Sequence, residues 1–400
     1  MNPAGIETIH LREGHARLLD LPWDQPLTRW AAISERIVDL PRGISRHEVR
    51  FVAFGANVYA IKDLATPIAQ REYERLMQLE ERRLPAVTPV GHAVVRHSGG
   101  ETRGMLVTRF LDGALPYRAL FQSPGLARYR ERLLDAIAGL LVRLHLAGVY
   151  WGDCSLSNTL FRRDAGALGA YLVDAETSDV HETLSNGQRV QDLLILEENV
   201  TGDIADLAAA AELPDGWLDD DAPERIRRRY DELWAEVSRE EIIAPGEMWR
   251  IPERVRALNA LGFSVGEIEL HAVSDGSLLR LRTLVTDRDY HRHRLHDLTG
   301  LVAEEHQAEL LMNEVHELKA RLSHELDRSV PLSVASYRWF NEHWLPAQTA
   351  MTDAAPGDVE PAEAYCQVLE HKWFLSERAR QDVGLEAAMR DYRMRFGGKP

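Results

Sequence analysis

Short runs rich in hydrophobic residues, separated by polar turn residues such as proline, glycine and asparagine, recur along the first third of the chain, a pattern typical of β-strands. These runs predict five strands, at residues 36–40, 48–54, 57–64, 90–96 and 105–110. Between the third and the fourth, Thr66-Pro67 supplies a capping hydroxyl and then a proline, which predicts the start of a helix. Residues 1–30 include a proline-broken stretch at 21–26, so we expect this segment to be a tether.

A second helix is predicted from a long apolar stripe with helical spacing. It begins near Ser123-Pro124 and ends at Gly148. Its apolar positions are Leu126, Tyr129, Leu133, Ile137, Leu140, Leu141 and Leu144. A polar loop at 150–158 follows directly, and a short strand is expected at 170–173.

From about residue 200 the pattern becomes mostly helical. Helices are predicted at 223–241, 252–261, 301–326 and 361–393, with a hairpin of 267–273 and 278–286 and a linker at 346–358. The whole pattern indicates an α+β fold with two lobes and a cleft between them, followed by a mostly helical C-terminal domain. The expected parts are a tether at 1–30, an N-lobe at 31–110, a C-lobe at 111–200, and a C-terminal domain of unknown role at 201–400.

Composition narrows the class of protein. Of the 400 residues, 45% are hydrophobic and 28% charged, which is typical of a globular chain able to bury large cores. A net charge of −16 disfavours general binding to nucleic acid or to anionic membranes. The start of the chain has no apolar signal core, and no apolar run approaches the roughly 18 residues of a membrane span. Because Cys154 and Cys366 offer no disulfide framework, we expect a cytoplasmic protein.

Lysine is rare in this chain, so each lysine is worth inspecting. Only four of the 47 basic residues are lysines. Lys62 lies on a predicted strand with Ala60 on the same face, where a small residue leaves room for a flat base while the ammonium reaches phosphates. In the next helix, Glu72 shares the apolar face and is better placed than Glu74 to pair with Lys62. The alternative is an ordinary surface ion pair, worth about 0–1 kcal/mol.

The polar loop holds the second group of candidate residues. Asp153 and Asn158 are five positions apart, and Asp174 ends the strand that follows. A kinase-type site needs an aspartate that takes the proton of an attacking hydroxyl, and two oxygen ligands of the kind that Mg²⁺ prefers. A turn and a helix cap use the same residue types, so the loop alone is a weak signal. The ordered set of lysine, glutamate, aspartate, asparagine and aspartate favours the site.

In this order, the motifs resemble those of the protein-kinase-like superfamily, within it the bacterial branch of lipopolysaccharide kinases and aminoglycoside phosphotransferases. Those families typically show His-Gly-Asp-x₄-Asn where this chain has Trp151-Gly152-Asp153 and Asn158. The likeness covers roughly residues 33–200. The chain is also similar to an uncharacterised bacterial family labelled lipopolysaccharide kinase-like, which has an extra C-terminal domain of unknown function.

The resemblance implies an enzyme that uses ATP and Mg²⁺. Lys62 and Glu72 would form the ion pair at the nucleotide phosphates. Asp153 would be the catalytic base, and Asn158 and Asp174 would be the metal ligands.

Further nucleotide contacts are implied by the same resemblance. Thr108-Arg109-Phe110-Leu111 would be the hinge whose backbone binds the adenine edge, and Asp192 would brace the catalytic loop through its backbone amides. The place of the glycine-rich loop is taken by Pro41-Arg42-Gly43-Ile44-Ser45-Arg46, which has one glycine. Arg42 and Arg46 either substitute for the missing backbone contacts to phosphate or lie on an exposed turn.

Three departures bear on the substrate and the activity. Ser155 stands where relatives keep a lysine or a histidine, and Glu176 replaces the glycine of Asp-Phe-Gly. No Ala-Pro-Glu follows, and the stretch from Asp174 to Asp192 is too short for a peptide-binding activation segment. We therefore expect the acceptor to be a hydroxyl of a small molecule, a glycan or a lipid-linked substrate.

Two alternatives stay open on the sequence alone. The missing cation at Ser155 and the reduced glycine loop fit a nucleotide-binding pseudokinase, whose C-terminal domain would engage a protein partner. Transfer of a nucleotidyl group on the same fold is a related possibility. The histidines between 291 and 324 and the arginines between 280 and 294 are expected to be solvated or structural, and Cys154 to be buried and inert.

Overall fold

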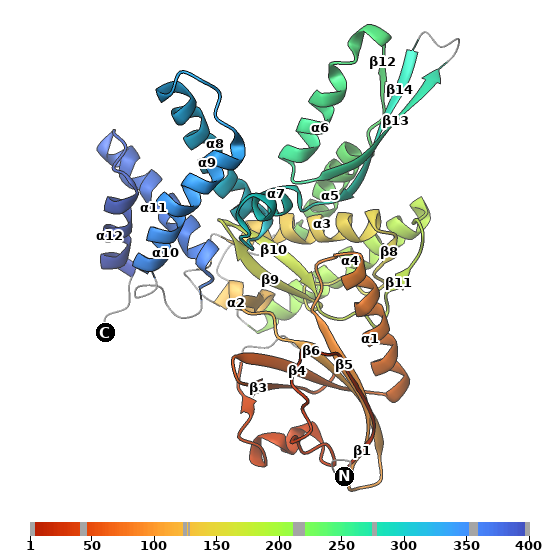
Figure 1. Cartoon of the computed structure of the whole chain (residues 1–400). Coiled ribbons are helices and arrows are strands. Elements are labelled where there is room, and N and C mark those ends of the chain that lie inside the picture. The colour runs from red at the N-terminus through yellow and green to blue at the C-terminus, as the bar shows by residue number, and fades with distance from the viewer. Residues whose placement is uncertain are drawn as a thin grey trace. The chain divides into compact units, whose positions relative to one another are not determined.

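The computed structural model describes residues 5–40, 46–122, 126, 129–210, 221–273, 278–351 and 359–396. The chain divides into two compact units. Figure 1 colours the chain by residue number, so each unit can be followed by its residues. The first unit is Met1–Arg162 with Ala170–Leu233, and the second is Arg163–Gly169 with Trp234–Pro400. A short internal segment, 163–169, thus belongs to the second unit.

The first unit begins with a six-stranded antiparallel sheet of strand order β1-β5-β6-β4-β3-β2. Its strands are β1 (Ile6–Leu11), β2 (Ile37–Val38), β3 (Val49–Phe54), β4 (Asn57–Leu64), β5 (Pro89–Arg96) and β6 (Thr102–Arg109). Helix α1 (Thr66–Glu81) packs against β5 and β6 and buries Leu76 and Leu79. Strand β4 lies beside α1. Both elements have nearly the bounds that the sequence predicts.

The N-terminal segment is part of this sheet rather than a tether. Strand β1 pairs with β5, and a short 3-10 helix, Leu27–Ala32, follows the proline-containing stretch. Trp23 and Trp30 are fully buried, with ring centroids 5.3 Å apart. Their indole N–H groups donate to the carbonyls of Leu18 and Gln25. The prolines prevent regular structure, but the two tryptophans supply the apolar burial and satisfy the irregular backbone.

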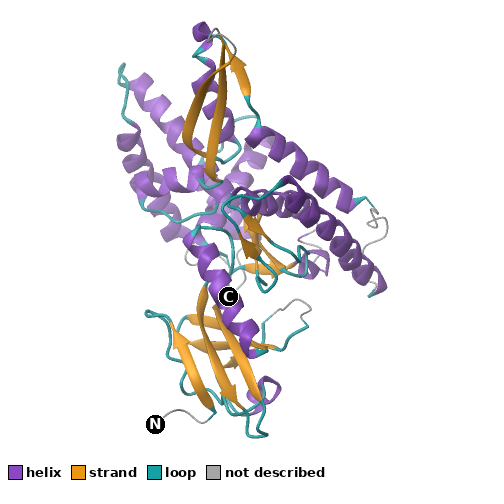
Figure 2. Ribbon diagram, turned by 90° about the vertical axis from the view of Figure 1, so that its right-hand side faces the viewer, coloured by secondary structure: helices purple, strands orange, loops and turns teal. Residues whose placement is uncertain are grey.

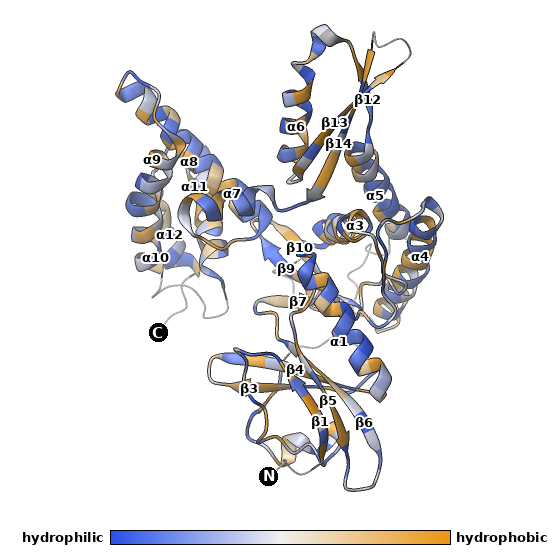
Figure 3. Ribbon diagram, turned by 45° about the vertical axis from the view of Figure 1, so that its right-hand side comes forward, coloured by the Kyte–Doolittle hydropathy of each residue, from blue (hydrophilic) through white to orange (hydrophobic). Residues whose placement is uncertain are grey.

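The rest of the first unit is a mainly helical lobe with short strands. Its elements are β7 (Ala114–Pro116), α2 (Tyr117–Gln122), α3 (Arg130–Leu146), β8 (Val149–Tyr150), β9 (Thr159–Asp164), β10 (Ala167–Leu172), β11 (Asp179–Val180), α4 (Asn186–Ala209) and α5 (Ala222–Ser238). The apolar stripe of α3 is buried. Figure 3 colours the residues of this helix and of the rest of the chain by hydropathy. The predicted helix start at Ser123-Pro124 lies outside the described residues. Helix α4 runs through residue 200, where the sequence predicts a domain boundary.

The second unit is mostly helical, as Figure 2 shows. Its elements are β12 (Glu241–Ile243), α6 (Arg250–Ala260), β13 (Ser264–Val273), β14 (Leu278–Asp287), α7 (Tyr290–Thr299), α8 (Glu305–Glu325), α9 (Leu332–Trp339), α10 (Leu345–Met351), α11 (Pro361–Ala379) and α12 (Leu385–Phe396), with a π-helical turn at Phe340–Trp344. The long helix predicted at 361–393 is two helices, because Arg380 adopts a left-handed conformation that ends α11. The predicted linker at 346–358 is helical up to Met351, and 352–358 lie outside the described residues. Among the described helices, none has the combination of length and apolar character that crossing a bilayer demands.

Candidate functional site

Three distant parts of the first unit meet at Lys62. Its Nζ atom, on β4, lies 3.0 Å from Oε2 of Glu72 on α1 and 2.7 Å from Oδ2 of Asp174, which follows β10. Glu72 is fully buried. Glu74, the competing partner in the sequence, accepts a hydrogen bond from Gln70 on the helix surface instead. The structure therefore pairs the lysine with the glutamate on the apolar face of α1.

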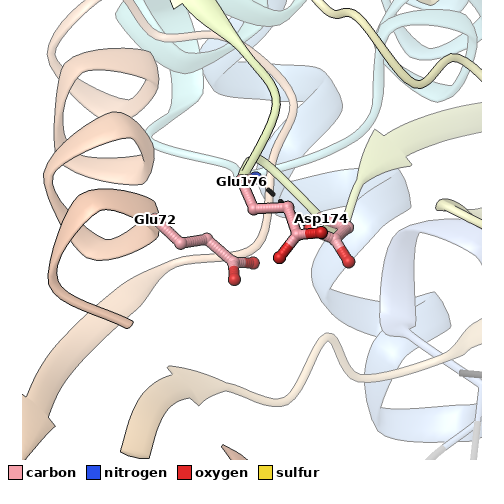
Figure 4. Close-up of side chains that lie close together, drawn as sticks. All are labelled: Glu72, Asp174 and Glu176. Atoms are coloured by element: carbon pink, nitrogen blue, oxygen red, sulfur yellow. Dashed lines mark hydrogen bonds between the residues drawn. The ribbon is translucent and has the colours of Figure 1, made fainter. Parts of the chain in front are cut away.

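A third carboxylate, that of Glu176, joins this cluster. Carboxylate oxygens of Glu72, Asp174 and Glu176 lie within 4.8 Å of one another, and Figure 4 shows them pointing toward one point. Burial and the charge of Asp174 raise the pKa of Glu72 to about 8, against the pull of Lys62. Burial acts to lower the pKa of Lys62, but the neighbouring carboxylates Glu72 and Asp174 outweigh it and raise that pKa.

The charge balance of this cluster indicates what it can bind. Lys62 contacts Glu72 and Asp174, and Glu176, which lies 3.7 Å from Nε2 of His47, adds a third carboxyl group. Even with Glu72 protonated at neutral pH, as its raised pKa favours, Asp174 and Glu176 outnumber the single ammonium. Hard oxygen donors with excess negative charge suit a divalent cation such as Mg²⁺. The residues present therefore fit the metal that the resemblance implies.

One face of β4 suits the base of a nucleotide. In the sheet register, Ala60 lies between Phe51 on β3 and Thr108 on β6. Residues opposite one another in antiparallel strands share a face, so these side chains and that of Lys62 lie on the same side. Phe110, in the predicted hinge, contacts the ring of Phe51 at 5.4 Å. The backbone N–H of Phe110 donates to the carbonyl of Val58.

The substitute for the glycine-rich loop is only partly described. Arg42 and Gly43 lie outside the described residues. Arg46 is described and exposed. Its predicted contact with phosphates stays a prediction.

The candidate catalytic loop, residues 150–158, is joined to the chain beside Asp174 by short contacts. The Asn158 amide donates to the carbonyl of Asp153 at 3.1 Å and to its Oδ2 at 2.9 Å. The N–H of Val173, beside Asp174, donates to the carbonyl of Asn158 at 3.1 Å. Gly152 has φ +79°, and an added Cβ would come within 2.9 Å of the carbonyl of Thr177. Glycine is required here both by the left-handed backbone and by this close approach.

A single face of helix α4 holds the loop in place. Asp192, Asn199 and Asp203 are seven and four residues apart, which places them on one side of a helix. Asp192 accepts from the N–H groups of Trp151 and Gly152, at 2.7 and 2.8 Å.

The two later residues of this face bind the rest of the loop. Asn199 donates to Oδ1 of Asp153 at 3.0 Å and to the carbonyl of Cys154 at 3.1 Å. Asp203 accepts from the N–H groups of Leu156 and Ser157, at 2.9 and 3.2 Å. The predicted bracing by Asp192 is present, and Asn199 and Asp203 hold the same loop from the same face of α4.

Asp192 is itself fixed by a buried histidine. Nε2 of His145 lies 3.1 Å from Asp192, and its Nδ1 lies 2.8 Å from the hydroxyl of Tyr230 on α5. Burial lowers the pKa of His145, against the pull of Asp192, which favours a neutral ring that both donates and accepts. Helices α3, α4 and α5 are therefore locked together behind the loop.

Four residues of this site escape sequence reasoning. They are Phe51, Glu176, Asn199 and Asp203. Glu176 is visible as a departure from Asp-Phe-Gly, but its position beside Glu72 is not. A helical repeat of polar residues on the otherwise apolar face of α4 is the signal that could have indicated Asn199 and Asp203.

Replacement of Asn199 by alanine is expected to lower kcat of phosphoryl transfer about tenfold and to change KM for ATP little. The reason is that the Asp153 carboxylate would lose one of the two amide donors that orient it. Steady-state kinetics with varied ATP test this. Thr201→Ala is the matched control on the same helix, since that hydroxyl bonds only its own helix backbone at Glu197. Equal losses in both variants would contradict a positioning role for Asn199.

The other candidates from the sequence take structural places. Cys154 is fully buried, and burial raises the pKa of its thiol. Ser155 accepts the N–H of Asn158 at 3.0 Å. Among the described residues, Glu72, Asp174 and Glu176 form the group with metal-ligand spacing, and the histidines between 291 and 324 form none. Arg280 and Arg282 pair with glutamates of their own unit.

Comparison with known families places this site. Residues 52–212 match the model of the lipopolysaccharide kinase (Kdo/WaaP) family. This stretch includes every site residue from Lys62 to Asp203. The predicted resemblance to the lipopolysaccharide kinase-like branch is confirmed. Residues 232–396 match the model of a domain of unknown function (DUF4032), which begins close to the second unit at Trp234.

Two solved structures are similar to parts of the chain. One is WaaP in complex with acyl carrier protein, 17% identical, covering 63% of this chain and 98% of that chain with a TM-score of 0.37. Another is the aminoglycoside-3′-phosphotransferase of type VIII, 18% identical, covering 50% of this chain and 86% of that chain with a TM-score of 0.31. No curated protein matches the chain. With the antiparallel N-terminal sheet and the mostly helical C-terminal part, the α+β kinase-like fold is as predicted.

Proposed function

We propose that the kinase-like domain is an ATP- and Mg²⁺-dependent phosphotransferase that acts, in the cytoplasm, on a hydroxyl of a small molecule, a glycan or a lipid-linked substrate. One observation carries the proposal: a chain of short contacts links all five predicted residues. Glu72, Lys62 and Asp174 are in direct contact, and Asp153 and Asn158 are joined to them through the Val173–Asn158 hydrogen bond. The family of the matched segment is one of kinases.

Each residue of this network has a role in the proposal. Lys62, held extended by Glu72, would bind the nucleotide phosphates. Asp153 would orient the acceptor hydroxyl and take its proton, and its carboxylate is fixed from both sides by the amides of Asn158 and Asn199. Asn158 and Asp174, with Glu176 beside them, would hold Mg²⁺, which neutralises charge on the phosphates when bound.

The segment after Asp174 supports a non-protein acceptor. Residues 179–180 form β11, which pairs with β8, and Ser185 already caps α4 through a capping box with Gln188. The chain between Asp174 and α4 is therefore only residues 175–185, and the pairing of β11 with β8 ties its middle to the domain. A long segment for binding a peptide has no place in it.

Transfer from radiolabelled ATP tests the proposal directly. The full chain is expected to release or transfer the labelled γ-phosphate in Mg²⁺ and to stop when EDTA removes the metal. Candidate acceptors that carry sugar or lipid-linked hydroxyls are then added one at a time. The true acceptor is expected to raise the rate of transfer of the labelled phosphate. A chain that is stabilised by MgATP against heat, yet forms no labelled product with any acceptor, would contradict phosphoryl transfer.

A pseudokinase is the second candidate, and Ser155 favours it. The hydroxyl is bonded within the loop, so this position offers no cation to the transferred phosphoryl group. Under this alternative the domain binds nucleotide and signals to a partner through the C-terminal unit. Thermal stabilisation by MgATP without turnover would support it, whereas a nucleotide-sized mass added to a target would indicate nucleotidyl transfer.

A further inference from the structure

One β-hairpin connects the two proposed metal ligands. Strand β9 begins at Thr159, directly after Asn158, and β10 ends at Leu172, two residues before Asp174. The hydrogen bond from Val173 N–H to the carbonyl of Asn158 closes the base of this hairpin. The position of both ligands therefore depends on how the hairpin is held.

The tip of the hairpin belongs to the other unit. Residues Arg163–Gly169 group with the C-terminal unit, whereas the strand ends on either side belong to the kinase-like unit. Ala165 and Gly166, at the turn, have φ values of +50° and +83°. Two successive left-handed residues are typical of the tightest hairpin turns, and for alanine this conformation costs about 1–2 kcal/mol.

Asp164 anchors the tip to the start of helix α8. The side chain is buried, with 3% exposed, and accepts the N–H groups of His306 at 3.1 Å and Gln307 at 2.8 Å. The ring nitrogen Nδ1 of His306 also lies 2.9 Å from Oδ2 of Asp164. A carboxylate at the N-terminus of a helix satisfies backbone N–H groups that have no partner within the helix.

Glu363, on α11, anchors the turn from a second side. It is also 3% exposed, and accepts the N–H of Ala165 at 2.8 Å and the side-chain amide of Gln307 at 3.1 Å. The left-handed Ala165 thus donates its N–H to a buried carboxylate that the C-terminal unit provides. Such a contact over-determines a strained turn and keeps it in one conformation.

We propose that the C-terminal unit positions the metal ligands of the kinase-like domain through this hairpin, with Asp164 and Glu363 as positioning residues. The inference rests on the proposed function, because it assigns a consequence to the placement of Asn158 and Asp174. Between the tip and the base, the paired strands β9 and β10 have six residues each and provide the continuous path for this coupling. By linkage, metal and nucleotide at the base would in turn tighten the tip.

Variants of the full chain test the coupling. Asp164→Ala and Glu363→Ala are expected to raise the Mg²⁺ concentration for half-maximal turnover about tenfold, with kcat at saturating Mg²⁺ nearly kept, as for losses behind a metal ligand. Glu363→Gln keeps an acceptor oxygen for Ala165 and should restore most of the affinity. Hydrogen exchange is expected to rise at the base, at the N–H of Val173 and along 159–162, as well as at the tip.

Glu314→Ala is the matched control. Glu314 accepts from Trp339 Nε1 and the Tyr365 hydroxyl inside the C-terminal unit, so these hydrogen bonds do not hold the hairpin tip. It should lower the stability of that unit and leave both the Mg²⁺ requirement and exchange at Val173 as in the wild type. The proposal is overturned if Glu314→Ala gives the same shift, or if Asp164→Ala frees the tip without any change at the base.

Hydrogen exchange distinguishes a failure of this inference from a failure of the proposed function. If no acceptor or nucleotide is ever turned over, the phosphotransferase proposal fails, but exchange at the base in Asp164→Ala still decides the coupling. If turnover is seen and exchange at Val173 is insensitive to the tip, the coupling fails alone.

Discussion

An Asp153→Asn variant is expected to transfer phosphoryl groups about a thousand times more slowly than the wild type, within the range of about 10²–10⁴-fold for a general base. The amide has nearly the shape of the carboxylate but cannot take the proton of the acceptor hydroxyl. Two amide donors, from Asn158 and Asn199, point at this side chain, so the new amide nitrogen would also face one of them.

The measurement is single-turnover transfer from radiolabelled ATP, with thermal stabilisation by MgATP measured on the same preparations. Binding is expected to persist, because the phosphate and metal contacts assigned to Lys62 and Asp174 are untouched. Undiminished transfer in the variant would remove Asp153 from the chemistry, and loss of MgATP binding would assign it to the nucleotide instead.

Lys62→Met is expected to have the second largest effect, lowering transfer on the order of a hundredfold and also destabilising the fold. Glu72 would then lie fully buried beside Asp174 without a cation. Removal of one partner from a buried ion pair typically costs about 3–5 kcal/mol. Proton uptake by Glu72 would limit this cost, so the loss of stability should depend on pH.

The sign of that dependence follows from Glu72. Burial and Asp174 raise its pKa in the fold from 4.5 to about 8, so the folded chain binds a proton that the unfolded chain has lost at neutral pH. This carboxyl therefore contributes stability at low pH that is lost as pH rises toward and through 8. Urea unfolding of Lys62→Met should show lower stability at pH 8 than at pH 6, and Lys62→Met/Glu72→Gln should flatten the difference. A single variant as stable at pH 8 as at pH 6 would mean that Glu72 ionises freely.

Much of the kinase-like unit can be predicted because its determinants are local. Apolar runs, the turn at 55–57 and helix capping predict β3, β4 and α1 almost to the residue, and helical spacing distinguishes Glu72 from Glu74. The loop motif brings Asp153 and Asn158 together because they are only five residues apart.

The rest depends on contacts between distant residues. Trp23 and Trp30 lie in or next to a stretch with prolines at 22 and 26, so no periodicity predicts their structure. Only the fold shows that the two rings pack on one another in the core of the N-terminal sheet. Asn199 is one polar residue among several on α4, and only the three-dimensional course of the loop selects it. The anchoring of Asp164 by His306 spans 142 positions, which no local pattern can specify.

On helix α4, spacing as well as residue identity decides whether the side chains that hold the loop 150–158 can reach it. A residue inserted between Asp192 and Asn199 would leave a good helix, since its cap at Ser185 and its apolar face before the insertion survive. It would nevertheless rotate Asn199 and Asp203 by about 100° about the axis, away from the loop they hold. This stretch should therefore tolerate many exchanges of side chain at its outer positions, yet no change of length.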